Sequence, residues 1–235
     1  MAKKLKYHLA FSGKLFFLPN SHLIAFLVLL VTLTLTIYLR IIFGSNTPYL
    51  PVPWYYPWVL AVPQLILLLF VSFVSEADRK PIEAVFHMPH NEGWFRQSII
   101  TVLASIVAIF LYAFIIYKID IPYLMPPQVP KNILGEEGFM LVNLFAMVLW
   151  VPFVEELFFR GFLLTYWIPK YGRVRSILLV SLVFMFAHSH PGLYFPVFMS
   201  SVLISYLFIK TKSLWPAFLS HAALNLLVVI VAASA

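Results

Sequence analysis

Long apolar stretches separated by short polar segments dominate the pattern along the chain. A helix needs about 20 apolar residues to cross the ~30 Å hydrocarbon core of a bilayer. The pattern predicts seven such spans, at residues 22–43, 54–75, 97–117, 138–157, 174–190, 192–209 and 213–234. We therefore expect an all-α, polytopic helical transmembrane bundle in which residues 1–235 form a single transmembrane domain.

The composition supports this class of protein. The chain of 235 residues is 62% hydrophobic and 11% charged, whereas a soluble domain is about 45–50% apolar and about 25% charged. The chain has no cysteine, which excludes disulfides, thiolate catalysis and cysteine metal clusters. We expect an integral, multi-pass membrane protein that has the lipid bilayer as a partner.

The distribution of basic residues predicts the orientation of the chain. If the N-terminus is cytoplasmic and seven spans alternate, thirteen of the 16 basic residues lie on the cytoplasmic side: Lys3, Lys4, Lys6, Lys14, Arg79, Lys80, Arg96, Arg160, Lys170, Arg173, Arg175, Lys210 and Lys212. Only Arg40, Lys118 and Lys131 lie outside. Basic residues collect on the cytoplasmic side of membrane proteins. The net charge of +7 therefore indicates a cytoplasmic N-terminus and an external C-terminus, not a nucleic-acid partner.

Two carboxylates stand inside an apolar run. Of nine acidic residues, only Glu155 and Glu156 fall within a predicted span, where a charge costs at least ~2.5–3.5 kcal/mol and usually serves a function. Glu156 and Arg160 are four residues apart, so they can form an ion pair on one helix face. A purely structural ion pair explains that carboxylate but not Glu155, which points ~100° away and needs another partner.

Later spans offer polar partners for Glu155. His188 lies in "FMFAH", and His221 and Asn225 lie four residues apart in "HAALN". Polar groups inside a membrane must find partners away from lipid, so we expect these side chains and Glu155 to converge on one cavity. Pro152 lies three residues before Glu155 and is expected to kink its helix there, because proline removes a backbone hydrogen bond.

Three short motifs occur in order: "EELFFR" (155–160) fits EExxxR, "FMFAH" (184–188) fits FxxxH, and "HAALN" (221–225) fits HxxxN. Together they resemble the CAAX protease and bacteriocin-processing family (CPBP, or Abi) of intramembrane glutamic endopeptidases. The resemblance covers about residues 150 to 226, and the motif-bearing catalytic core is expected over about 138–234. Residues 1 to 135 carry no motif of the family.

The resemblance implies a hydrolase that cleaves a peptide bond without a metal or other cofactor. Glu155 and His188 would activate a water, and His221 and Asn225 would stabilise the oxyanion. Glu156 and Arg160 would support the site. Low-dielectric surroundings disfavour the charged form of a carboxylate and so make it a better proton acceptor, and amide N–H groups serve in oxyanion holes. The expected partners are a peptide or membrane-protein substrate, in a prokaryotic plasma membrane.

Three other functions stay open. A zinc-dependent membrane metalloprotease would use Glu and His ligands, but the chain has no H-E-x-x-H motif. A non-catalytic scaffold or immunity protein could share the same fold, although all six motif residues are present. A transporter would show inverted repeats and paired broken helices, and the sequence shows neither.

The seven-span arrangement places two of these residues at different depths. Glu155 lies near the cytoplasmic end of its span, whereas His188 lies ~20 Å from the cytoplasmic start of a helix that begins at residue 174. Helices at 158–170 and 171–177 that project beyond the membrane would bring the two residues level. Alternatively, 138–152 and 154–169 are two helices that meet at Pro152, which would give eight membrane segments.

Overall fold

Helices account for all the regular structure in the part of the chain that the structure describes. The computed structural model describes residues 21–44, 56–76, 86–89, 92–127, 134, 139–188 and 190–234. No strand occurs among these residues, so the prediction of an all-α fold is confirmed. The N-terminal lysines and Lys131 lie outside the described residues, and the predicted orientation therefore stays a prediction.

The N-terminal half contributes α1 (Ser21–Gly44), α2 (Tyr56–Ala61), α3 (Gln64–Glu76), α5 (Trp94–Lys118) and the 3₁₀ turn η1 (Pro122–Leu124). A long helix then runs through α6 (Met140–Leu144), η2 (Phe145–Trp150), α7 (Val151–Glu156), η3 (Leu157–Leu164) and α8 (Thr165–Tyr171). The chain ends with α9 (Arg173–Phe186), α10 (Pro191–Thr211) and α11 (Leu214–Ser234).

Each predicted span corresponds to helical structure, but the count of seven crossings is not confirmed. Among the described residues, four helices are long and apolar enough to cross a bilayer: Trp94–Lys118, Met140–Tyr171, Pro191–Thr211 and Leu214–Val231. The predicted span 54–75 is two helices, α2 and α3, separated by a turn at Val62 and Pro63. The 14 residues of α9 extend only ~21 Å, which is less than the ~30 Å of a hydrocarbon core.

The helix that carries the two glutamates is longer than the sequence pattern predicts. It runs without a break for 32 residues from Met140 to Tyr171, about 48 Å at 1.5 Å per residue. It thus continues past the end of the predicted span at residue 157, as the alternative with further helix at 158–170 expected. The alternative with two helices meeting at Pro152, and hence eight membrane segments, is wrong. Proline is tolerated here because it occupies the second position of α7, directly after the π-helical stretch η2, where the regular hydrogen-bond ladder is already interrupted.

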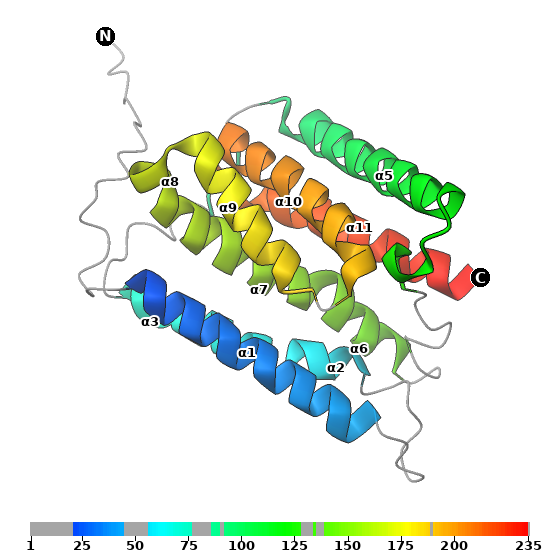
Figure 1. The fold of residues 1–235 in the computed structure, drawn as a ribbon. Helices are drawn as coiled ribbons and strands as arrows, with labels where there is room; N and C mark the ends of the chain where they lie inside the picture. Colours follow the sequence, from blue (N-terminus) through cyan, green and yellow to red (C-terminus); the bar gives the residue numbers. More distant parts are fainter. Residues whose placement is uncertain are drawn as a thin grey trace.

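The long helix lies at the centre of the bundle (Figure 1). In Figure 1, α1 and α3 cover one side of it, α9, α10 and α11 cover the other, and α5 lies outermost against α10 and α11. All eight residues of η3 are buried, including the charged Arg160. Phe158, Phe159 and Phe162 form the centre of the main core together with Phe70 and Phe184.

A tight turn at Gly172 brings the later helices back alongside the long helix. Gly172 has φ +77°, a conformation that glycine adopts at little cost, and α9 then returns against η3, where the rings of Phe159 and Phe184 are 4.8 Å apart. Glu155 lies 16 residues before the end of α8 (171 − 155) and His188 lies 15 residues after the start of α9 (188 − 173). The two residues are therefore at nearly the same height, and the difference in depth inferred from the sequence disappears.

The outer helix α5 separates two environments. Its outward face exposes large apolar side chains, among them Leu103, Phe110 and Phe114, which suits contact with lipid tails. Its inward face buries Ser98, Thr101 and Ser105, and the hydroxyls of Ser98 and Ser105 donate to carbonyl oxygens one turn earlier. Small residues of this kind let membrane helices approach closely.

Candidate active site

The paired charges on the long helix form the ion pair that their spacing predicts. Arg160 Nη1 donates to Glu156 Oε1 over 2.7 Å, and neither side chain is exposed. A buried pair of this kind is stable only when its remaining hydrogen-bonding groups also find partners. The structural ion pair expected from the sequence is thus confirmed.

The guanidinium of Arg160 has further partners on α10. Its Nη2 donates to Ser201 Oγ over 2.9 Å and to the carbonyl oxygen of Ser201 over 3.2 Å, and its Nε donates to Ser205 Oγ over 3.3 Å. The Phe184 ring lies 4.9 Å from the guanidinium carbon, a distance at which a cation is attracted to an aromatic face. Arg160 is therefore held on several sides and acts as a fixed positive charge.

The neighbouring carboxylate, Glu155, faces different partners, as its position on the helix predicts. Gln64 on α3 donates from Nε2 to Glu155 Oε1 over 3.1 Å. On the other side, His221 Nε2 lies 3.8 Å from Glu155 Oε2, which is too long for a hydrogen bond. The side chain of Glu155 is 15% exposed, whereas that of Glu156 is fully buried. Of the two carboxylates, only Glu155 is accessible to another molecule.

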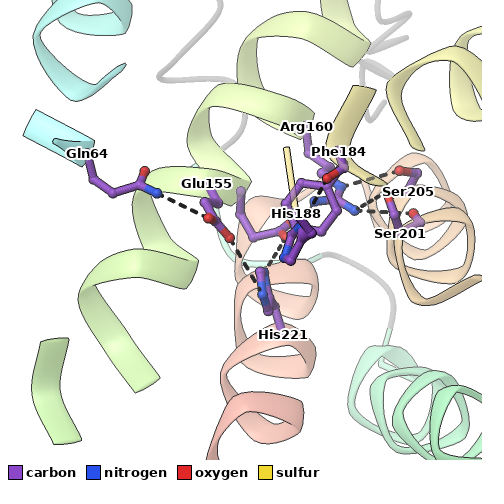
Figure 2. A network of polar contacts seen from close by, with 9 residues as sticks. Gln64, Glu155, Arg160, Phe184, His188, Ser201, Ser205 and His221 are labelled. Carbon is purple, nitrogen blue, oxygen red and sulfur yellow. Dashed lines mark hydrogen bonds and ion pairs between the residues drawn. The ribbon is translucent and has the colours of Figure 1, made fainter. Parts of the chain in front are cut away.

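His221 on α11 stands between the two carboxylates (Figure 2 shows it below Glu155 and beside His188). Its Nδ1 lies 2.8 Å from Glu156 Oε1, which already accepts from Arg160. A carboxylate oxygen accepts hydrogen bonds, so Nδ1 carries the hydrogen. In a neutral imidazole, Nε2 then holds a lone pair and faces Glu155. If Nε2 also carried a proton, His221 would present a hydrogen-bond donor toward Glu155.

His188 follows the end of α9 and has the same tautomer for a different reason. Its Nδ1 lies 2.9 Å from the carbonyl oxygen of Phe184, four residues earlier, and a carbonyl oxygen accepts only. The lone pair of the neutral ring is therefore on Nε2. The Phe184 ring packs edge-on against both His188, at 5.0 Å, and His221, at 5.8 Å. Phe184 thus contacts both histidines and the guanidinium of Arg160.

Asn225 lies one turn beyond His221 but has a partner outside the carboxylate cluster. Its Nδ2 donates to the carbonyl oxygen of Met147 over 3.0 Å. A π-helical turn would pair that carbonyl with the backbone nitrogen of residue 152, which is a proline without an N–H. Asn225 supplies the missing donor and still has its second amide hydrogen. The expected convergence of Asn225 with the carboxylates is thus only partial.

Three residues of this network were not singled out from the sequence. Gln64 follows Pro63 as a lone amide in an apolar stretch, and Ser201 and Ser205 are four residues apart on α10. The signal for Gln64 was present, because an isolated amide inside a predicted span needs a partner. The serines carried no such signal, because their hydroxyls can bond to the backbone of their own helix.

The charges of the cluster are close to balanced. Arg160 contributes one positive charge, and Glu155 and Glu156 contribute two negative charges when ionised. One additional proton, shared among Glu155, His188 and His221, makes the cluster neutral, which lowers the cost of burying it. The site can therefore hold one mobile proton next to an accessible carboxylate. Within the described residues, no group of three or more His, Asp or Glu side chains is arranged to hold a metal ion.

One comparison with known proteins gives a match. Residues 137–227 match the model of the family described as type II CAAX prenyl endopeptidase Rce1-like, and this range includes the three motifs at 155–160, 184–188 and 221–225. No curated protein and no solved structure matches the chain. Gln64 lies outside the matched range. The resemblance seen in the motifs is confirmed: over residues 137–227 this helical membrane protein is similar to the Rce1-like family of type II CAAX endopeptidases.

Proposed function

We propose that the chain is an intramembrane endopeptidase that hydrolyses a peptide bond with a water activated by Glu155 and His188. The observation that carries the proposal is the different environment of two adjacent glutamates. Glu156 is fully buried and bound to Arg160 and His221. Glu155 is partly exposed, and within the described part of the chain its one partner at ion-pair distance is His221, at 3.8 Å. Enzymes use such pairs by giving the two carboxylates separate tasks.

The reaction begins with transfer of a proton from water. Glu155 is the acceptor, and the Nε2 lone pair of His188 orients the water or shares its proton. The oxygen of the water then bonds to the carbonyl carbon of the substrate, and the carbonyl oxygen becomes an oxyanion. Collapse of this tetrahedral intermediate breaks the C–N bond, and the proton held by the site passes to the leaving amine. The products are a carboxylic acid and an amine.

His221 and Asn225 are the proposed donors to the oxyanion. When His221 carries a second proton, its Nε2–H can donate, while the bond between Nδ1 and Glu156 keeps the ring in place. Asn225 can donate its second amide hydrogen, while its bond to Met147 keeps the carboxamide in place. Preorganised donors of this kind commonly contribute ~10²–10³ in rate each.

The substrate class follows from the family whose model matches the chain. The description of that family names CAAX prenyl endopeptidases, so we propose a peptide with a C-terminal CAAX sequence, presented at the membrane surface. Substrate and enzyme would then share the bilayer. We place the N-terminus in the cytoplasm, on the side with most of the basic residues, and the protein in a prokaryotic plasma membrane.

The proposed function is tested with purified protein in liposomes. A farnesylated CAAX peptide and the same peptide without the prenyl group are incubated with the wild type and with Glu155→Gln, and the products are identified by mass spectrometry. We expect cleavage by the wild type only. A comparison of the peptides released by cells with wild-type protein and with Glu155→Ala extends the search to other substrates. If neither assay yields a product that depends on Glu155, the protein is not a Glu155-dependent peptidase, and the non-catalytic alternative gains support.

A further inference from the structure

Gln64 links the first half of the chain to the proposed catalytic carboxylate. It is the first residue of α3 and lies 91 positions before Glu155, outside the range that matches the endopeptidase family. Its side chain donates from Nε2 to Glu155 Oε1 over 3.1 Å, and the residue is only 9% exposed. We propose that Gln64 is a positioning residue for Glu155, an inference that rests on the proposed function.

The two polar atoms of the Gln64 side chain differ in their hydrogen bonding, and this difference indicates the role of the residue. Nε2 is bonded to Glu155, whereas Oε1 is buried without a hydrogen-bond partner among the described residues. A buried acceptor without a partner destabilises a fold, so an amide that served stability alone would be bonded at both ends. Rotation of the amide would place Oε1 against the carboxylate of Glu155, and two acceptors repel. Glu155 therefore fixes the orientation of the amide.

In return, Gln64 restricts the orientation of the carboxylate. The last torsion of a glutamate is broad, so an unbonded carboxylate can rotate among many positions. With Oε1 held by Gln64, the second oxygen, Oε2, faces His221 at 3.8 Å. Figure 2 shows Gln64 and His221 on opposite sides of Glu155. The amide of Gln64 thus keeps Oε2 of Glu155 directed toward His221.

The turn that precedes Gln64 is hydrogen-bonded to the central helix. Trp150 Nε1 donates to the carbonyl oxygen of Ala61 over 2.9 Å, which secures the turn between α2 and α3 to the helix that carries Glu155. The turn at Val62 and Pro63 then directs α3 along α7. The division of the predicted span 54–75 into two helices therefore places Gln64 beside Glu155.

The test uses Gln64→Met, which keeps the approximate size and removes both polar atoms. We expect kcat for the farnesylated CAAX peptide to fall by ~10–100-fold, as is usual when a residue that orients a catalytic group is lost, with KM within about twofold, because Gln64 does not touch the substrate. Gln97→Met is the matched control: Gln97 on α5 also has a buried Oε1 that finds no partner in the described structure but lies outside the site. Its kcat should stay at the wild-type value.

A double-mutant cycle tests the contact without reference to catalysis. Melting temperatures are measured for the wild type, Gln64→Met, Glu155→Leu and the double variant. Side chains in contact give non-additive changes, so we expect the loss of Gln64 to have a different effect once Glu155 is absent. If Gln64→Met does not fold, Trp150→Phe, which releases the turn at Ala61, should lower kcat in the same direction.

The outcomes separate the inference from the proposed function. Additive melting temperatures, or an active enzyme whose kcat is unchanged in Gln64→Met, would overturn the role of Gln64 and leave the peptidase in place. A rise in KM at constant kcat would also overturn it, because that result marks a substrate contact instead. A wild-type protein that cleaves no peptide would remove the proposed function, and the positioning role with it, even if the cycle shows the contact.

Discussion

The same substitution should affect the stability of the protein differently at the two adjacent glutamates. Glu155→Gln and Glu156→Gln each exchange a carboxylate for an amide of the same shape. Glu155 is partly exposed and has one hydrogen bond, from Gln64, whereas Glu156 is fully buried and accepts from both Arg160 and His221. We expect Glu155→Gln to abolish turnover with little loss of stability, and Glu156→Gln to lose both.

The magnitude for Glu156→Gln follows from the burial of its partner. Arg160 is fully buried, and removing one partner of a buried pair commonly costs ~3–5 kcal/mol, because the other charge is left uncompensated. The guanidinium keeps its bonds to Ser201 and Ser205, and the new amide oxygen can still accept from it. We therefore expect the free energy of unfolding to fall by ~3 kcal/mol, the lower end of this range. Such a change lowers the ratio of folded to unfolded protein by more than ~100-fold.

The loss expected for Glu155→Gln is much smaller. The amide oxygen can still accept from Gln64, and no cation among the described residues lies at hydrogen-bond distance from the charge that is removed. Removal of a partly buried charge can itself be favourable, so the melting temperature should equal or exceed that of the wild type. Turnover should stop, because an amide does not accept a proton from water at neutral pH.

The assay measures melting temperature and cleavage of the farnesylated peptide for both variants in detergent and in liposomes. His188→Ala serves as a comparison and should resemble Glu155→Gln. If Glu155→Gln still cleaves while a stable Glu156→Gln is inactive, the assignment of the two roles is inverted. If all three variants cleave at the wild-type rate, the charged residues form a structural ion pair only, and the catalytic interpretation is wrong.

Four further predictions concern other parts of the molecule. Asn225→Ala should bind the peptide with unchanged KM and lower kcat by ~10²–10³-fold, and it should also lower the melting temperature slightly because the carbonyl of Met147 loses its donor; an unchanged kcat would exclude Asn225 from the oxyanion site. Exhaustive chelation should leave cleavage intact, since the proposed groups activate water by proton transfer alone; activity that is lost with bound zinc and restored with it would establish the metalloprotease. Gly192→Ala should destabilise the protein by ~1–3 kcal/mol, because the new Cβ would clash with the backbone oxygen of Met125; an unchanged melting temperature would show that this segment moves freely. A C-terminal reporter that is active only in the cytoplasm should stay silent, and a signal from it would contradict an odd number of crossings.

The features predicted correctly from the sequence depend on residues close together in the chain. The all-helical class follows from the apolar runs alone. The ion pair of Glu156 and Arg160 follows from their spacing of four, because a helix places such residues on one face whatever surrounds it. The different direction of Glu155 follows from the ~100° step between neighbours. These relations are set by the geometry of a single helix.

The errors and omissions arise where contacts between helices decide the structure. The apolar pattern placed the end of the span of Glu155 at residue 157 and did not decide whether the helix continues beyond it. In the structure the buried segment η3 continues it, since its aromatic side chains pack against α3 and α9. Pro152 suggested a break, but Asn225, 73 positions away (225 − 152), supplies the hydrogen bond that the proline cannot.

The tertiary structure also decides which polar groups meet. The sequence by itself determined that Glu155, His188, His221 and Asn225 each need a partner, because a polar group in an apolar span cannot be left without one. It did not determine the partners, because those depend on how each helix is rotated and shifted against its neighbours. The packing of α3 and α11 on either side of α7 places Gln64 and His221 beside Glu155. The same packing places the side chain of Asn225 against the backbone carbonyl of Met147.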